Sequence, residues 1–351
     1  MNKSGKKGLL LKIILAFIFL AIIVGGISAW QVYKAIYREN TILQGKSSAY
    51  FYIHTGWKAE DVYNALYSKG YVKDKNIFEW LAEKKNYPNN VHPGKYRLKK
   101  QMSHNEIINL LRSGKQEPID LLIENLHSLK NLASRAGKQL EADSSDIYDI
   151  LKDTEYLKKY GFNTQNIISM FIANKYRFQW NTSAEQFFER MYQEYKKFWN
   201  DNRETKLKKI GLTHLQAITL ASIIEMESKK RDEQPVVAGV YMNRLRKDMP
   251  LQADPTVIFA NGDWSIRRVL KKHLEIDSPY NTYKYTGLPP GPICMPSIAA
   301  INAVLDYEKH EYIYFCAKED FSGYHNFAAC YAQHLANARR YQNALNRNNI
   351  N

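Results

Sequence analysis

The sequence predicts an α+β protein of more than one domain, preceded by a single apolar segment near its amino terminus. Three observations support this prediction. The chain has 351 residues, which is enough for two or three domains. Its apolar content of 45% is too high for a largely disordered chain. Short runs of alternating apolar residues are interspersed with longer segments of helical periodicity, as expected when strands and helices share a fold.

Residues 9–30 form a nearly continuous apolar run that is long enough to span a bilayer as a helix. Lysines crowd the short segment before it, so the positive-inside rule places residues 1–8 in the cytoplasm and everything after Trp30 outside. A cleaved signal peptide with Ile27-Ser28-Ala29 at its cleavage site is the alternative. We favour the uncleaved anchor, because the run exceeds a usual signal-peptide core and Ile27 is not small. Both interpretations predict export.

The formal net charge of the chain is +15. On an exported chain this charge predicts anionic surroundings, either lipid headgroups or a wall polymer that carries carboxylates. Nucleic acid, the usual partner of a basic chain, is disfavoured by export and by the lack of zinc-finger, basic-zipper or aromatic-basic sheet motifs in the sequence. Lysines that only solvate the surface account for most of the individual charges.

Three cysteines, Cys294, Cys316 and Cys330, cannot all pair within one chain. One disulfide and one free thiol would suit an oxidising compartment. Their spacing matches neither a metal site nor a redox pair, so buried, apolar thiols are the expectation. The sequence predicts no metal and no cofactor.

Residues 31–48 are predicted to form a polar, helical stalk, and residues 49–117 a small α+β module. The predicted strand, helix, helix, strand and capped helix of the module fall at Tyr50–Ile53, Val62–Gly70, Ile77–Lys85, Tyr96–Leu98 and Ser103–Ser113. This size and order resemble the LysM type of carbohydrate-binding module. A spacer that only holds the next domain away from the membrane is the alternative.

Residues 118–345 are predicted to form a larger α+β domain. From Ile119 to Lys209 this part is charged and mostly helical, and its aromatic residues between Gln186 and Trp199 recur at helical spacing, which indicates core. Thr213 is placed to cap the next helix, which carries Glu225, and a second helix is expected over Val236–Arg246.

The most informative stretch is Leu220–Ser228, which places a carboxylate in an apolar helical face. At about 100° per residue, Glu225 shares its face with Ile218 and Ala221, whereas Glu227 is rotated from it by about 200° and is expected to point the other way. Glu225 alone is therefore predicted to be desolvated. A desolvated carboxyl keeps its proton to higher pH, as a general acid near neutral pH requires. A helix that frays into solvent at Glu225 is the alternative.

Three loop clusters that follow this helix are dense in amide and aromatic groups. An amide at Gln252 or Asn281 and a ring at Tyr280 or Tyr283 suit a sugar, whose polar groups need planar hydrogen-bond partners and whose C–H face stacks on aromatic rings. Each residue is a weak signal alone, and Asn281 could equally hold a turn. Together they predict a cleft for a sugar polymer. The clusters are Leu251–Thr256, Ser278–Tyr283 and Gly287–Pro292.

The order of six motifs resembles the membrane-anchored endolytic murein transglycosylases, the YceG-like family. The motifs are Leu220–Glu225, Asn243–Leu245, Leu251–Thr256, Tyr280–Tyr283, Gly287–Gly291 and His325–Phe327. The likeness covers roughly residues 46–345 and is most specific in the last third. The resemblance implies that residues 49–117 are LysM-like, that residues 118–345 are the catalytic domain, and that Glu225 corresponds to the family's catalytic glutamate.

The chain departs from the family pattern at two places. The usual Pro-Asp before a tyrosine is Ala173-Asn174 here, and the Pro-Gly expected after the proline-rich loop is Pro296-Ser297. We expect these departures to alter local loop shape and to leave Glu225 untouched.

The resemblance implies non-hydrolytic cleavage of the β-1,4 bond between N-acetylmuramic acid and N-acetylglucosamine within nascent peptidoglycan strands. Glu225 would protonate the leaving oxygen and then take the proton of the C6 hydroxyl of the same muramic ring, which leaves a 1,6-anhydro end. One acid suffices, because the attack is intramolecular, whereas a glycosidase normally uses two carboxylates. Such an enzyme would act at the plasma (inner) membrane, on the periplasmic side, beside peptidoglycan synthases or division proteins, and would influence glycan length and cell shape.

Several alternatives stay open. Asp254 could face Glu225 and permit hydrolysis by a muramidase, although an aspartate beside a proline more often anchors a turn. His325 could line the cleft or be a hydrogen-bonded structural histidine. Glu227 and Glu233 could support the site or merely solvate the helix. A non-catalytic scaffold that binds the wall is the alternative from another class of protein.

Overall fold

The computed structural model describes residues 3–39, 43, 46–124 and 126–348 of the chain. These residues divide into two compact units, Met1–Ile119 with Gln179–Asn181, and Asp120–Phe178 with Thr182–Asn351. Each unit contains both helices and strands. The predicted α+β class is therefore confirmed.

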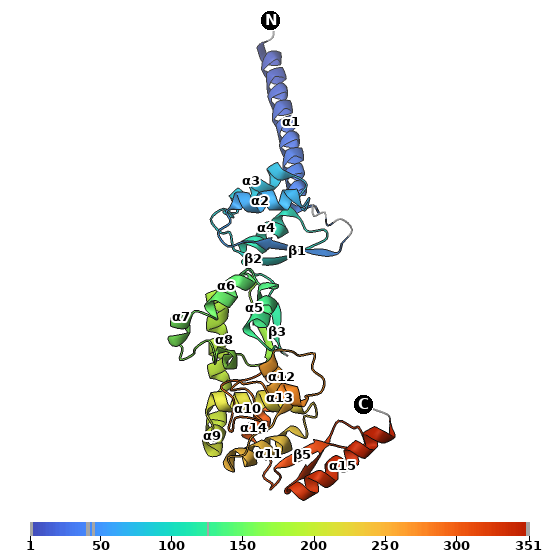
Figure 1. The fold of residues 1–351 in the computed structure, drawn as a ribbon. Helices are drawn as coiled ribbons and strands as arrows, with labels where there is room; N and C mark the ends of the chain where they lie inside the picture. The colour runs from blue at the N-terminus through green and yellow to red at the C-terminus, as the bar shows by residue number, and fades with distance from the viewer. Residues whose placement is uncertain (1–2, 40–42, 44–45, 125, 349–351) are drawn as a thin grey trace. The chain divides into compact units, whose positions relative to one another are not determined.

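A single long helix, α1 (Lys3–Tyr37), comes first in the chain (Figure 1). Its segment Ile14–Tyr37 has 24 residues and contains an 18-residue stretch with a mean hydropathy of 2.2 and no buried residue, so it is long and apolar enough to cross a membrane. The predicted apolar segment is thus helical throughout, as a lone spanning segment must be to satisfy its backbone hydrogen bonds. Part of the predicted stalk, at residues 40–42 and 44–45, lies outside the described residues.

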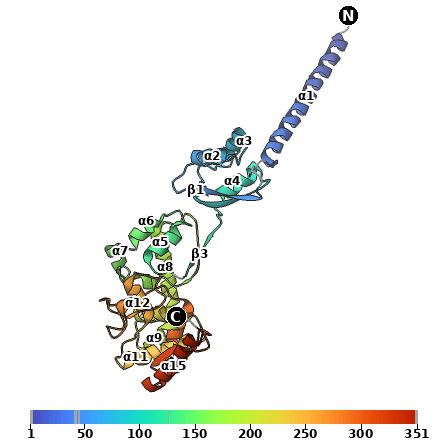
Figure 2. The ribbon, with the colours of Figure 1, turned by 45° about the vertical axis from the view of Figure 1, so that its right-hand side comes forward.

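The smaller unit is built on an antiparallel ribbon of β1 (Ser48–Ile53) and β2 (Gly94–Lys99). Alternate residues of the two strands, Phe51, Ile53, Tyr96 and Leu98, are fully buried, so this face of the ribbon packs into the core of the unit. The helices α2 (Ala59–Ser68), α3 (Lys75–Lys84) and α4 (His104–Arg112) lie on the same side of the ribbon (Figures 1 and 2). The predicted strand–helix–helix–strand order is confirmed, and so is the capping box of Ser103 and Glu106.

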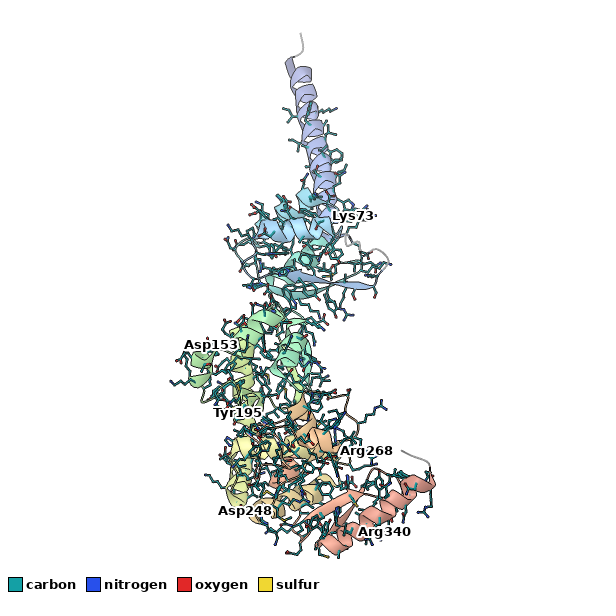
Figure 3. The ribbon with its side chains drawn as sticks, viewed as in Figure 1. Lys73, Asp153, Tyr195, Asp248, Arg268 and Arg340 are labelled. Atoms are coloured by element: carbon teal, nitrogen blue, oxygen red, sulfur yellow. The ribbon has the colours of Figure 1, made fainter. Side chains whose placement is uncertain are left out.

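The first part of the larger unit contains two strands that the sequence did not reveal, β3 (Ile119–Ile123) and β4 (Asn174–Phe178), which pair with each other. Its helices are α5 (Leu129–Gly137), α6 (Ser144–Ile150), α7 (Thr154–Lys158), the 3₁₀ helix η1 (Ile167–Met170) and α8 (Ala184–Phe198). The aromatic residues of α8 are core, as predicted: Phe187 and Phe188 are 0% exposed. Tyr195, labelled in Figure 3, packs against both hydrophobic clusters of this unit and so links its two parts.

The second part of the larger unit is centred on α10 (His214–Glu227), whose residues 217–224 are all buried. Thr213 caps this helix as predicted, since its hydroxyl accepts the Gln216 N–H. Helix α10 packs against α11, α12 and α14. The surrounding helices are α9 (Asp201–Ile210), α11 (Gln234–Arg246), α12 (Asp254–Asn261), α13 (Lys271–Leu274) and α14 (Ile298–Leu305).

Two sequence expectations need correction in this part. The cluster at Leu251–Thr256 is not a loop throughout, because α12 begins at Asp254 and a proline in the first helical turn favours a helix start. The cysteines are all free, and only Cys294 is buried, whereas Cys330 is exposed just before α15 (Tyr331–Arg347). That helix packs against the antiparallel pair of β5 (Tyr314–Ala317) and β6 (His325–Ala328).

Candidate active site

Two glutamates in the last turn of α10, Glu225 and Glu227, lie in different surroundings. The residues just before them, Leu220–Ile224, are 0% exposed, so the helix emerges from the core only at its end. Glu225 and Glu227 are both half-buried there. Because they are two positions apart on a helix, their side chains leave on different sides.

Glu225 lines a cavity of ≈ 430 Å³. Its Oε2 accepts two hydrogen bonds from Ser297, one from Oγ at 2.5 Å and one from the backbone N–H at 3.3 Å. Within the described part of the chain, Oε1 accepts none. One carboxyl oxygen is therefore held by the protein, and the other is available to a ligand that enters the cavity.

The prediction that Glu225 alone is desolvated, and that Glu227 points to solvent, is wrong. Glu227 accepts a hydrogen bond from the Tyr241 hydroxyl at 3.1 Å. Burial, and then the charge of Asp254, raise the pKa of Glu227 from 4.5 to about 7. The reason is that α11, which carries Tyr241, packs on the face of α10 that helical periodicity alone assigns to solvent.

Three of the predicted substrate-binding residues gather around Glu227. The Tyr283 hydroxyl donates to Oδ1 of Asp254 at 2.5 Å, and burial and that carboxylate raise the pKa of Tyr283. Gln252 Oε1 accepts from the Arg244 guanidinium at 3.4 Å. Asp254 therefore lies beside Tyr283 and Glu227, and it is not among the residues that line the Glu225 cavity.

The other three predicted residues have mainly structural partners. Asn281 is 0% exposed; its amide donates to two backbone carbonyls and accepts the Tyr283 N–H, which is the turn-holding alternative. Tyr280 is half-buried and packs on a ring of α12. His325 Nδ1 lies 2.7 Å from the buried carboxylate of Glu233, which also accepts the His325 N–H. This matches the structural histidine considered above.

The polar residues that accompany Glu225 in its cavity were missed as site residues. They are Glu124, Asn174, Lys175, Arg231 and Ser297. The only signal in the sequence was that Asn174 and Ser297 fall at the two departures from the family pattern. The expectation that these departures leave Glu225 untouched is wrong for Ser297, which bonds to it directly. A parallel backbone bridge between Ala173 and Ser297 brings the two departures together.

The cavity combines two carboxyls, Glu225 and Glu124, with cationic, amide and hydroxyl groups, which suits a polar ligand rich in hydroxyls and carboxylates. Among the described residues, no three His, Cys, Asp or Glu side chains come together as a metal site would require.

Known proteins resemble this chain over most of its length. Residues 51–340 match the YceG-like family. A Bacillus subtilis (strain 168) protein named endolytic murein transglycosylase is 28% identical over 291 residues, which are 78% of this chain and 80% of that protein. A Streptococcus pneumoniae serotype 2 (strain D39) protein of the same name is 29% identical over 296 residues, or 76% of this chain, and the chain spans about half (53%) of its length.

A solved structure agrees with the family match. The crystal structure of a YceG-like protein from Listeria monocytogenes superposes with a TM-score of 0.56 at 29% sequence identity, covering 83% of this chain and 99% of that one. Both the sequence and the fold therefore point to one group of proteins, and the chain belongs to the YceG-like family.

Proposed function

We propose that this protein is an endolytic lytic transglycosylase, which cuts the β-1,4 bond between N-acetylmuramic acid and N-acetylglucosamine inside peptidoglycan strands and leaves 1,6-anhydro ends. The observation that carries the proposal is the Glu225 carboxyl at a cavity, with one oxygen held by Ser297 and the other without a hydrogen bond among the described residues. The names of the bacterial relatives support the same activity.

In this mechanism Glu225 gives its proton to the glycosidic oxygen as the bond from C1 of the muramic ring to that oxygen breaks. The resulting carboxylate then takes the proton of the C6 hydroxyl, whose oxygen bonds to C1 of the same ring. No water enters the product, so a second carboxylate to activate water is not needed. Arg231 and Lys175 add positive charge to the cavity for the carboxylates of a muramyl peptide.

The six other predicted substrate residues have weaker support as direct contacts. Gln252, Asp254 and Tyr283 form the polar wall around Glu227. Tyr280 is the predicted residue best suited to stack on a sugar, since Asn281 and His325 are bonded to the protein. We assign those two to holding the cleft's shape.

The amino-terminal part completes the proposal. Residues 49–117 are proposed as a LysM-like module, and a pocket of ≈ 470 Å³ in the smaller unit, with Trp57, Tyr63 and Asn89 in its lining, offers rings and an amide to a glycan. The apolar helix α1 is proposed as the anchor that leaves residues 118–345, the catalytic domain, outside the plasma membrane. Peptidoglycan synthases and division proteins are the proposed partners there.

The test compares wild-type protein with Glu225→Gln on purified glycan strands. Glutamine keeps the size of the side chain and cannot transfer the proton. We expect Glu225→Gln to bind strands and to release no 1,6-anhydro fragments, as mass spectrometry would show. Equal release by both proteins would overturn the proposal, and turnover by neither would favour the non-catalytic scaffold.

One observation favours a second candidate, a muramidase that hydrolyses the same bond. Glu227, with its pKa raised to about 7 by burial and by Asp254, is a carboxyl that stays protonated near neutral pH beside a second acid, and hydrolytic glycosidases use such pairs. Hydrolysis would give fragments heavier by one water, with reducing ends. It would be lost in Glu227→Gln and kept in Glu225→Gln, the reverse of the main proposal.

A further inference from the structure

The segment Ile293–Ser297 lies along α10 and is fixed by its backbone. The Ile293 N–H donates to Ser222 Oγ at 3.0 Å, and the Met295 N–H donates to a carbonyl of the loop after β3 at 2.9 Å. The parallel bridge from Ser297 to Ala173 adds a third attachment. The position of Ser297 is therefore set independently of its own side chain.

The hydroxyl of Ser297 has one proton, and its neighbours decide where that proton points. Ser297 is the N-cap of α14, so its Oγ accepts the Ala300 N–H at 3.2 Å. The other close partner of Oγ is Oε2 of Glu225, at 2.5 Å. An ionised carboxylate only accepts hydrogen bonds, so the hydroxyl proton is directed at Oε2. The Ser297 N–H, at the positive end of α14, is a second donor to the same oxygen.

We propose that Ser297 is a positioning residue for the acid of the reaction, which holds Oε2 of Glu225 so that Oε1 does the proton transfer. Two donors on one oxygen limit the rotation of the Glu225 carboxyl, so Oε1 stays available to the substrate in each turnover. A glycine, the residue expected here from the family pattern, keeps only the backbone donor. The inference rests on the proposed function, in which Glu225 is the acid.

Other charged or titratable groups also face Glu225, and the test must leave them unchanged. The cavity includes Glu124 from the loop after β3, Lys175 from β4 and Arg231 from the loop after α10. Lys229 donates to the backbone carbonyl of Glu225 at 3.1 Å. Burial, and then the nearby carboxylate, raise the pKa of Cys294 to about 12, so this thiol stays neutral. Substitutions at Ser297 alter none of these groups.

The decisive variant is Ser297→Gly. It removes the hydroxyl and keeps the backbone N–H, and glycine is itself a well-tolerated N-cap residue. In Ser297→Gly, kcat for 1,6-anhydro product formation should fall by about tenfold and KM should stay unchanged, because one donor instead of two then holds the carboxyl. Ser297→Thr, which keeps a hydroxyl, should restore kcat to its wild-type value. An unchanged kcat in a Ser297→Gly protein with a wild-type unfolding midpoint would overturn the inference.

A second measurement separates this inference from the proposed function. In protein labelled with ¹³C at glutamate carboxyls, the Glu225 signal is identified by its loss in Glu225→Gln, and its chemical shift at a fixed pH reports the hydrogen bonds to the carboxyl. We expect the signal to move in Ser297→Gly and to return in Ser297→Thr, whether or not the protein turns over. If Glu225→Gln keeps its activity, the proposed function fails. If the signal does not move in Ser297→Gly, the role of Ser297 fails.

Discussion

The two carboxyl groups at the end of α10, on opposite sides of the helix, have different surroundings. On one side Glu225 borders a cavity and receives both Ser297 donors on a single oxygen. On the other side Glu227 is bonded to Tyr241, and burial and the charge of Asp254 raise its pKa to about 7. In the proposed mechanism desolvation therefore does not by itself identify the reacting acid, because a group that transfers protons to a polymer must also be reachable by that polymer.

The largest expected effect is on the rate of turnover, which should distinguish Glu225 from Glu227. Glu225→Gln should lower the rate of release of 1,6-anhydro fragments by about 10³-fold, the usual contribution of a general acid–base group. Glu227→Gln, the matched control two residues away, should lower it by less than about tenfold. The measurement is fragment release from glycan strands at saturating substrate. The reverse ranking would move the chemistry to the Glu227 side.

A large effect on stability is expected at Asn281. Its amide makes three hydrogen bonds to backbone groups while 0% exposed, so Asn281→Ala should lower the free energy of unfolding by about 2–3 kcal/mol. Urea unfolding of the purified protein measures this. A variant of wild-type stability whose KM for glycan strands is raised would instead show that Asn281 binds sugar.

A smaller effect concerns pH and Glu227. Its raised pKa means that the folded chain binds this proton more tightly than the unfolded chain, so the associated stability is present below pH 4.5 and is lost as the pH rises through about 7. Glu227→Gln lacks this dependence. As the pH rises from 4.5 to 8, the unfolding free energy of Glu227→Gln should increase relative to that of the wild type by about 1–3 kcal/mol. Parallel stability curves would show that Glu227 is not desolvated.

The smallest expected effect is at Arg231. If its charge helps to bind muramyl peptides, Arg231→Ala should raise KM by about three- to fivefold and leave kcat nearly unchanged, because exposed ion pairs contribute about 1 kcal/mol or less. The increase should shrink at high salt. Lys209→Ala removes an exposed cation on α9, outside this cavity, and is the control. An equal rise in KM in both variants would indicate only a general charge effect.

Much of the fold was predictable because its signals are local. The cap at Thr213, the buried stripe of α10 and the alternation in β1 each follow from neighbouring residues. The strands β3 and β4 were missed because β4 carries Lys175 and Arg177 on its exposed face, so it does not look like a strand. Their pairing joins segments far apart in the sequence, for which a single sequence holds no signal.

The site was predictable only in part, for the same reason. Helical periodicity singled out Glu225, which lines the cavity. It misjudged Glu227 because it cannot show that α11 packs on the opposite face of α10. The contact between Ser297 and Glu225 depends on how residues 293–297 return along α10. In the sequence, Ser297 stood out only as a departure from a family pattern.

The most direct test of the central claim is the mass of the glycan fragments that wild-type, Glu225→Gln and Glu227→Gln proteins release from the same strands. We predict 1,6-anhydro fragments, each lighter by one water than its hydrolytic counterpart, from the wild type and from Glu227→Gln, and none above background from Glu225→Gln. Fragments with reducing ends that persist in Glu225→Gln and vanish in Glu227→Gln would contradict the account.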